Sequence, residues 1–171
     1  MGVQRLYPDA VFSSATALLN PLRRIKSDEE VEVMRRAGEV TETAFAAVLK
    51  QLKHGMTELE VMSEVDFQLR RHGALGPSFV TSMYNSGPNY SLIFGKREEK
   101  WLRRLEPPVA LLFDFGAAFE GYSYDYGRTV AFGQPNEEFQ RVFNLVMESQ
   151  AAGIAALKQG NTTAEADAAA R

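Results

Sequence analysis

The segment from Val109 to Phe132 constrains the fold of this chain more than any other part of the sequence. Residues 109–118 are apolar apart from one aspartate, and residues 122–132 are rich in aromatic and β-branched side chains. The short stretch between them, Phe119-Glu120-Gly121, is typical of a tight turn. The pattern therefore predicts two antiparallel strands joined in a hairpin.

Two aspartates, Asp114 and Asp125, lie inside this β-rich segment, where an isolated ionised carboxylate is costly to bury. A two-residue turn at Phe119-Glu120 would place them directly opposite each other, and a turn at Glu120-Gly121 would place them diagonally. Because side chains alternate along a strand, both registers put the two carboxylates on one face of the hairpin. A three-residue loop would put them on opposite faces.

Two like charges at this separation repel each other, and a bound cation would remove the repulsion. Oxygen ligands suit Mg, Mn, Ca, Zn and Co, so the pair alone does not name the metal. Two other arrangements fit the spacing. One aspartate is exposed at a strand edge while the other pairs with Arg128, or the carboxylates act as general acid and base, as in glycosidases.

Two amphipathic helices are predicted before the hairpin. Capping-box sequences at residues 27–30 and 57–60 mark their starts, and Gly55 and Gly73 mark their ends. Between the second helix and the hairpin, the composition predicts a strand at 79–84, a turn at 85–89 and a short strand at 91–94, and the mixed charges of residues 96–104 favour a solvated face.

Two further helices are predicted after the hairpin. Asn136 is a suitable N-cap for an amphipathic helix that ends at Gly160. Thr162 or Thr163 is expected to cap a last helix, which begins a few residues before the end of the sequence. The whole pattern predicts an α+β protein.

Composition limits the classes of function. With 22 acidic and 19 basic side chains the net charge is −3, so we expect no binding to nucleic acid. The absence of cysteine excludes disulfides and thiolate chemistry, and two histidines leave little for a histidine-based site. The longest apolar run, residues 109–113, is far shorter than the about 20 residues that span a bilayer. We expect a cytoplasmic protein whose chemistry relies on carboxylates.

The hairpin resembles the signature of the pita-bread metallopeptidases, the family of methionine aminopeptidase, prolidase, Xaa-Pro aminopeptidase and creatinase. The resemblance rests on Asp114-Phe115-Gly116-Ala117, Gly121-Tyr122, and Asp125 with Arg128-Thr129. Further similarity to the prolidase and Xaa-Pro aminopeptidase branch occurs at residues 22–30, 55–58, 73–74, 87–89 and 151–160. The resemblance covers most of residues 20–171.

The resemblance implies that residues 27–171 form the first half of a pita-bread catalytic domain, a curved antiparallel sheet flanked by helices. Residues 1–26 resemble a connector from a preceding N-terminal domain. The family's activity implies a metal-dependent exopeptidase that cleaves peptides with proline at the second position.

The resemblance also implies roles for single residues. Asp114 would be a terminal ligand of one metal ion and Asp125 would bridge two ions, typically Mn, Co or Zn. Arg128 would contact these metal ligands without binding the metal itself. Tyr84 and Asn89 are expected to contact the substrate.

The sequence departs from the family pattern in three ways. The downstream His and two Glu ligands are not present, Phe94 stands at the usual place of a substrate-facing His, and Gly127 replaces a common Thr or Ser. We therefore expect a truncated chain that is inactive alone and associates with the missing C-terminal half or as a homodimer. The alternatives are a catalytically silent module that binds peptide or protein, and a purely structural dimerisation half.

Overall fold

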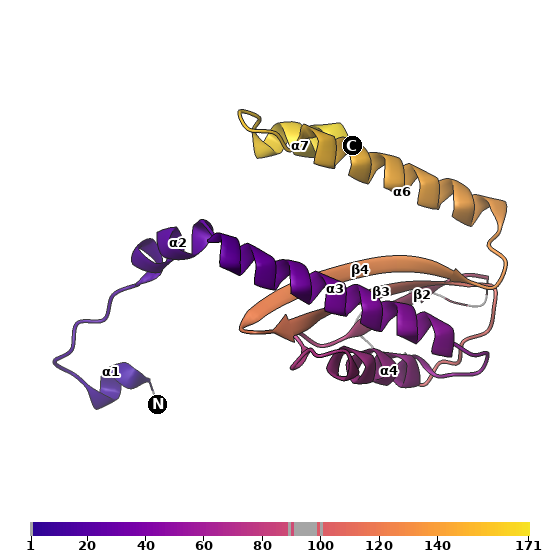
Figure 1. Cartoon of the computed structure of the whole chain (residues 1–171), viewed down its shortest axis with the longest axis horizontal. Coiled ribbons are helices and arrows are strands. Elements are labelled where there is room, and N and C mark those ends of the chain that lie inside the picture. Colours follow the sequence, from indigo (N-terminus) through magenta and orange to yellow (C-terminus); the bar gives the residue numbers. More distant parts are fainter. Residues whose placement is uncertain (1, 89, 91–98, 100) are drawn as a thin grey trace.

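The computed structural model describes residues 2–88, 90, 99 and 101–171. Helices α1 (Val3–Leu6) and α2 (Thr16–Arg24) form an N-terminal arm, which is followed by α3 (Asp28–Gln51) and α4 (Glu58–Arg71). Figure 1 shows the arm reaching away from the rest of the molecule. The remaining elements are β1 (Gly76–Pro77), β2 (Ser82–Ser86), β3 (Val109–Phe119), β4 (Tyr122–Phe132), α6 (Glu137–Ala156) and α7 (Thr163–Ala170).

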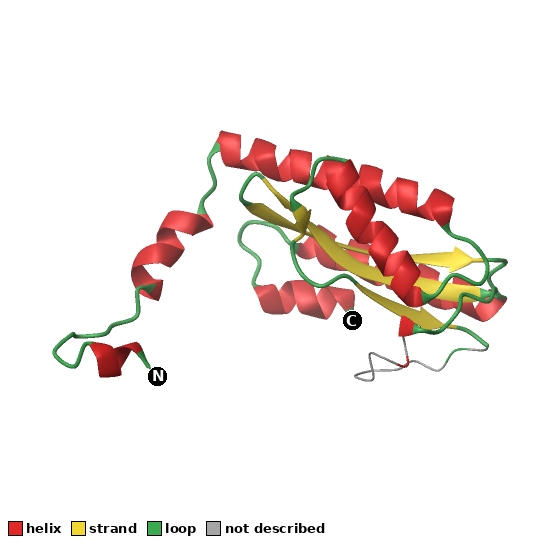
Figure 2. Cartoon of the chain, turned by 90° about the horizontal axis from the view of Figure 1, so that it is seen from below, coloured by secondary structure: helices red, strands yellow, loops and turns green. Residues whose placement is uncertain are grey.

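The sheet is antiparallel, with β3 at its centre. Strands β1 and β2 pair with successive parts of one edge of β3, and β4 pairs with the other edge along its whole length. Helices α3 and α4 pack against the sheet (Figure 2). The α+β class and the antiparallel sheet flanked by helices are therefore confirmed.

The β3–β4 hairpin turns at Glu120 and Gly121, because Phe119 pairs with Tyr122. Both turn residues have positive φ, 46° for Glu120 and 85° for Gly121, as a type I′ hairpin turn requires. Of the two registers that the sequence allows, the diagonal one is therefore present.

The core lies between the sheet and the two helices that cover it. The ring centroid of Phe45, from α3, lies 5.0 Å from that of Phe113 and 5.6 Å from that of Phe115, both on β3. Val65 and Leu69 of α4 are buried in the same cluster. Apolar side chains at helical spacing thus meet alternate residues of a strand, and burial of such side chains is the main stabilising term.

The capping residues act as predicted. Ser27 and Thr57 both accept a hydrogen bond from the backbone three residues on and complete capping boxes, so α3 and α4 begin where the sequence indicates. Asn136 caps α6, and of the two threonines considered for α7 it is Thr162 that caps it.

The predicted strand at 79–84 is wrong in its position. Strand β2 starts at Ser82, opposite Asp114, and continues to Ser86, so that the turn begins at Gly87. Thr81 instead donates its hydroxyl to the Asp66 carboxylate of α4 and thereby anchors the chain before the strand begins. The predicted strand at 91–94 lies outside the described residues.

The predicted solvated face at 96–104 is wrong for Arg103. Its guanidinium lies 2.7 Å from Oε1 of Glu58, a side chain with 0% exposure, and Nδ2 of Asn85 donates to the same oxygen at 2.8 Å. Leu105 N–H donates to the Met56 carbonyl, which brings this segment alongside the start of α4. An ion pair between residues 45 positions apart has no signature in the local charge pattern.

Helix α6 forms as predicted, but none of its residues is buried in the part of the chain that the structure describes. It packs on α7, and the pair stands apart from the sheet in Figure 1. No helix among the described residues has the length and apolar character needed to cross a membrane. The large apolar side chains of α6 and its C-cap that remain exposed are Val142, Leu145, Val146, Met147, Ile154 and Leu157.

The two helical hairpins share a local sequence that the analysis above did not detect. The pattern Leu-Lys-x-Gly-x-Thr-x-x-Glu occurs at residues 52–60 and again at 157–165. In both copies the glycine has positive φ, 83° at Gly55 and 97° at Gly160, and the threonine and glutamate form a capping box. The α6–α7 turn is therefore built in the same way as the α3–α4 turn.

We predict that Gly116→Ala destabilises the fold by about 3 kcal/mol, near the upper end of the usual cost of overpacking. A Cβ at this position would lie 2.0 Å from the backbone oxygen of Tyr124 and 2.5 Å from Oγ of Ser78. Urea unfolding followed by circular dichroism measures the change.

Gly127→Ala is the matched control, because among the described residues its Cβ would meet only the Phe113 carbonyl oxygen, at 3.6 Å. We expect this variant to unfold within about 0.5 kcal/mol of the parent. Equal unfolding free energies for the two variants would contradict the close approach at Gly116.

Candidate metal centre on the open face of the sheet

One face of the sheet is turned away from α3 and α4 and is called the open face here. Since Phe113 and Phe115 point into the core, their neighbour Asp114 lies on the open face. The register places Asp125 on the same face of the adjacent strand. The hairpin therefore brings the two predicted carboxylates together, as both of the two-residue turns require.

The four positions around the pair alternate between aspartate and glycine. Asp114 is opposite Gly127, and Asp125 is opposite Gly116, so the two carboxylates occupy one diagonal and the two glycines the other. Diagonal neighbours on a sheet are about 7–8 Å apart at Cα, and their side chains approach more closely. Among the described residues, the space above Gly127 is open, whereas Ser78 and Phe79 fill the space above Gly116.

Neither aspartate has a hydrogen-bond or ion-pair partner among the residues that the structure describes. Asp114 is half-buried and Asp125 is exposed. Two free carboxylates on one face form a donor set suited to a divalent cation. Within residues 2–88, 90, 99 and 101–171 no group of three or more His, Cys, Asp or Glu is arranged to hold a metal, so the pair is an incomplete ligand set.

Arg128 lies on the opposite face of β4 from Asp125, because it pairs with the core residue Phe113. Its guanidinium carbon is 4.1 Å from the centroid of the Tyr126 ring, and its Nη1 donates to the Gly127 carbonyl at 2.7 Å. The alternative in which Arg128 pairs directly with one of the aspartates is therefore not seen.

The predicted substrate-contacting residues divide into two groups. Tyr84 pairs with Leu112 on β3, which puts it on the open face near Asp114. Asn89 and Phe94 lie outside the described residues.

Contacts from α3 hold the tip of the hairpin that carries the aspartates. Arg36 donates to both carboxylate oxygens of Glu120, at 2.9 and 3.3 Å, and its guanidinium carbon lies 5.1 Å from the centroid of the Phe119 ring. Tyr122 donates its hydroxyl to Glu30 at 2.6 Å. Sequence reasoning assigned Glu30 only to the capping box and missed this second role, since the partner is 92 residues away.

The sequence of residues 32–171 matches the model of metallopeptidase family M24. The chain belongs to this family. The match includes the whole β3–β4 hairpin with both aspartates, and the predicted family resemblance is thereby confirmed.

Named relatives of this M24 chain are peptidases. It is 36% identical over 160 residues to the uncharacterized peptidase YqhT of Bacillus subtilis (strain 168), covering 94% of this chain and 44% of YqhT. It is 32% identical to the Xaa-Pro dipeptidase of Pyrococcus furiosus over 94% of this chain and 45% of the dipeptidase. The chain thus spans less than half the length of these relatives.

A solved structure shares the fold. The X-Pro aminopeptidase of Thermotoga maritima MSB8 superposes with a TM-score of 0.81 at 27% sequence identity, over 98% of this chain and 47% of the aminopeptidase. The architecture is therefore that of part of a pita-bread domain. These names do not favour a silent binding module.

We predict that Tyr122→Phe lowers the free energy of unfolding at pH 7, and that the difference shrinks in acid. The hydrogen bond from Tyr122 lowers the pKa of Glu30, and the Ser27 N–H acts in the same direction. A lowered pKa stabilises the fold above the ordinary Glu value of about 4.3, and this stabilisation is lost as the pH falls through the lowered pKa.

Urea unfolding at pH 7 and pH 3 tests this prediction. Tyr7→Phe is the control, because Tyr7 is exposed in the N-terminal arm and its hydroxyl has no partner among the described residues. A difference between Tyr122→Phe and the parent that is the same at both pH values would refute the coupling to Glu30.

Proposed function

We propose that residues 27–171 are the first half of the catalytic domain of a metal-dependent exopeptidase of the Xaa-Pro type. The observation that carries the proposal is the pair of carboxylates, Asp114 and Asp125, on one face of the hairpin with glycines at the other diagonal, neither of them partnered within the residues that the structure describes. The named relatives with Xaa-Pro specificity support it.

Asp114 is assigned as a terminal ligand and Asp125 as a bridging ligand of two divalent ions, Mn, Co or Zn. Bound ions of this kind polarise a scissile carbonyl and lower the pKa of water. The chain's own contribution is to orient the two carboxylates, through the hairpin register and the clamp from α3. The open space at Gly127 leaves room beside Asp114.

Arg128 is assigned an indirect role in this site. It holds the carbonyl of Gly127, the residue directly opposite Asp114, and so supports that part of the ladder from the helix-facing side. Tyr84 and Asn89 are assigned to the substrate, a peptide with proline at its second position.

We assign the remaining metal ligands to a second half of the domain. The chain spans 44% and 45% of two curated relatives, and it holds two of the expected ligands. The exposed apolar face of α6 is suited to contact that half or a second copy of this chain in a homodimer. Residues 1–26 are assigned as a connector, and the location as cytoplasmic, in keeping with the absence of cysteine.

A silent peptide- or protein-binding module is the second candidate. Phe94, in place of a substrate-facing His, and Gly127, in place of a hydroxyl residue, favour it. Both aspartates are present, however, and a silent module has no need to keep two repelling carboxylates together. Metal binding separates the two candidates.

We predict that the purified chain binds Mn²⁺ and Zn²⁺, and that Asp114→Asn and Asp125→Asn each weaken binding at least tenfold. Each substitution removes one anionic oxygen donor and leaves a neutral amide of the same shape. Isothermal titration calorimetry measures the affinities.

Asp9→Asn is the control, because Asp9 is an exposed aspartate of the N-terminal arm. We expect it to bind both metals like the parent. Absence of binding by the parent chain, or equal binding by all four proteins, would count against the proposed metal centre in this half.

We also predict that the chain alone does not hydrolyse Xaa-Pro peptides in the presence of Mn²⁺, because two carboxylates do not complete a two-metal site. Release of the N-terminal amino acid is followed by chromatography, with the Pyrococcus furiosus Xaa-Pro dipeptidase as a positive control for the assay. Mn²⁺-dependent hydrolysis that disappears in Asp114→Asn would overturn this prediction.

A further inference from the structure

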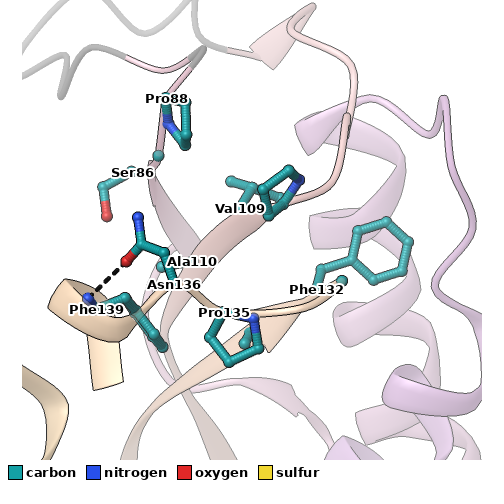
Figure 3. Close-up of a pocket in the computed structure, with 12 residues that line it drawn as sticks. Ser86, Pro88, Val109, Ala110, Phe132, Pro135, Asn136 and Phe139 are labelled. Atoms are coloured by element: carbon teal, nitrogen blue, oxygen red, sulfur yellow. Dashed lines mark hydrogen bonds between the residues drawn. The ribbon is translucent and has the colours of Figure 1, made fainter. Parts of the chain in front are cut away.

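A small pocket of about 40 Å³, open to solvent, lies at the end of the sheet where β3 begins (Figure 3). Its walls come from the turn after β2, the entry to β3, the end of β4 and the first turn of α6. Three of the lining residues are prolines, Pro88, Pro108 and Pro135. Proline fixes its own φ, so these walls are preformed and lose little entropy when a ligand binds.

Asn136 presents unused hydrogen-bond donors at this pocket. Its Oδ1 accepts from the Phe139 N–H at 2.7 Å to cap α6, and this bond fixes which end of the amide faces the helix. Its Nδ2 has no partner among the described residues. Figure 3 shows this nitrogen turned toward the hydroxyl of Ser86, which likewise has no partner in the described part of the chain.

The residues that line the pocket are suited to bind a peptide rather than an ion. An amide donor and a hydroxyl complement the carbonyl and N–H of a peptide unit. The remaining walls are apolar, with Ala110 and Phe132 among them, and no ionisable side chain lines the pocket in the described part of the chain. A small apolar side chain attached to a peptide backbone meets both requirements.

The pocket and the two aspartates share the open face. Ala110 precedes Asp114 by four residues on β3, a separation of about 13 Å along a strand. An extended peptide advances about 3.3–3.6 Å per residue, so about four residues cover this distance. Leu112 lies between them on the same face, is 41% exposed, and pairs with Tyr84 and Thr129 on either side.

We propose that this pocket, called the Ser86–Asn136 pocket, binds a small apolar side chain of the substrate about four residues beyond the scissile bond. A dipeptide spans about 7 Å and does not reach from the aspartates to the pocket. The enzyme to which this chain belongs therefore prefers oligopeptides with a small apolar residue at that position. The inference rests on the proposed function, because Asp114 and Asp125 define where the scissile bond lies.

The test is a titration of the ¹⁵N-labelled chain with two hexapeptides, followed by nuclear magnetic resonance in the absence of metal. The peptides are Ala-Pro-Gly-Gly-Val-Gly and Ala-Pro-Gly-Gly-Gly-Gly, which differ only in the fifth residue. We expect the valine peptide to bind at least fivefold more tightly. Its binding is expected to shift the side-chain amide of Asn136 and the backbone amides of Ser86 and Ala110.

Asn136→Asp is the decisive variant, because an aspartate keeps the oxygen that caps α6 but has no N–H donors. Because the Asn136 donor is assigned to the peptide backbone, we expect both hexapeptides to bind at least threefold more weakly to this variant, while its thermal unfolding midpoint stays the same. Ser86→Ala is expected to weaken the valine peptide, and Ser123→Ala, an exposed serine of β4 outside the pocket, is its matched control.

Equal affinities of the parent chain for the two peptides, or unchanged affinities in Asn136→Asp, would overturn the proposed pocket. Neither the peptides' fifth residue nor these variants alters the two aspartates. Metal titration therefore reports on the proposed function separately, and a failure of either proposal is distinguishable from a failure of the other.

Discussion

The two-residue turn at Glu120 and Gly121 is the constraint on which the candidate site depends. One additional residue in this turn would reverse the alternation along β4 and move Asp125 to the helix-facing side. Glu120 adopts a φ of 46°, which is uncommon for a residue other than glycine. Its carboxylate is held by Arg36 of α3, and Tyr122, the first residue after the turn, donates its hydroxyl to Glu30 of the same helix. The helix therefore supports the turn that keeps the two aspartates together.

The other edge of β3 is fixed from the helix side in a different way. Glu58 is fully buried at the start of α4, and burial of a carboxylate is unfavourable unless charged and polar partners meet it. Arg103 and Asn85 supply those partners, and Asn85 belongs to β2. Its neighbours Tyr84 and Ser86 point to the open face. One strand thus attaches to the helix layer through Asn85 and turns Tyr84 and Ser86 to the open face.

Local chemistry made much of this fold predictable. The caps at Ser27, Thr57 and Asn136 and the hairpin at 109–132 depend on residues close in sequence, and the structure confirms them. The alternation of side chains along a strand, together with a two-residue turn, was also sufficient to predict that the two aspartates lie on one face. The start of β2 and the burial of Arg103 were predicted incorrectly, because both depend on partners far along the chain. The sequence did not decide between a turn at Phe119-Glu120 and a turn at Glu120-Gly121, and the pairing of Phe119 with Tyr122 in the structure shows that the second is present.

The arrangement of the open face explains why this chain tolerates two neighbouring carboxylates that have no partner in the described part of the structure. Aspartates at diagonal positions repel each other, and a core position would add a desolvation penalty to that repulsion. Asp125 is exposed and Asp114 only half-buried, so solvent screens the pair in the absence of a cation. Glycine at the two other corners leaves the space beside them open on the Gly127 side. Stability of the hairpin therefore comes from its opposite face, where Phe113 and Phe115 pack on α3, and the open face is left to serve binding.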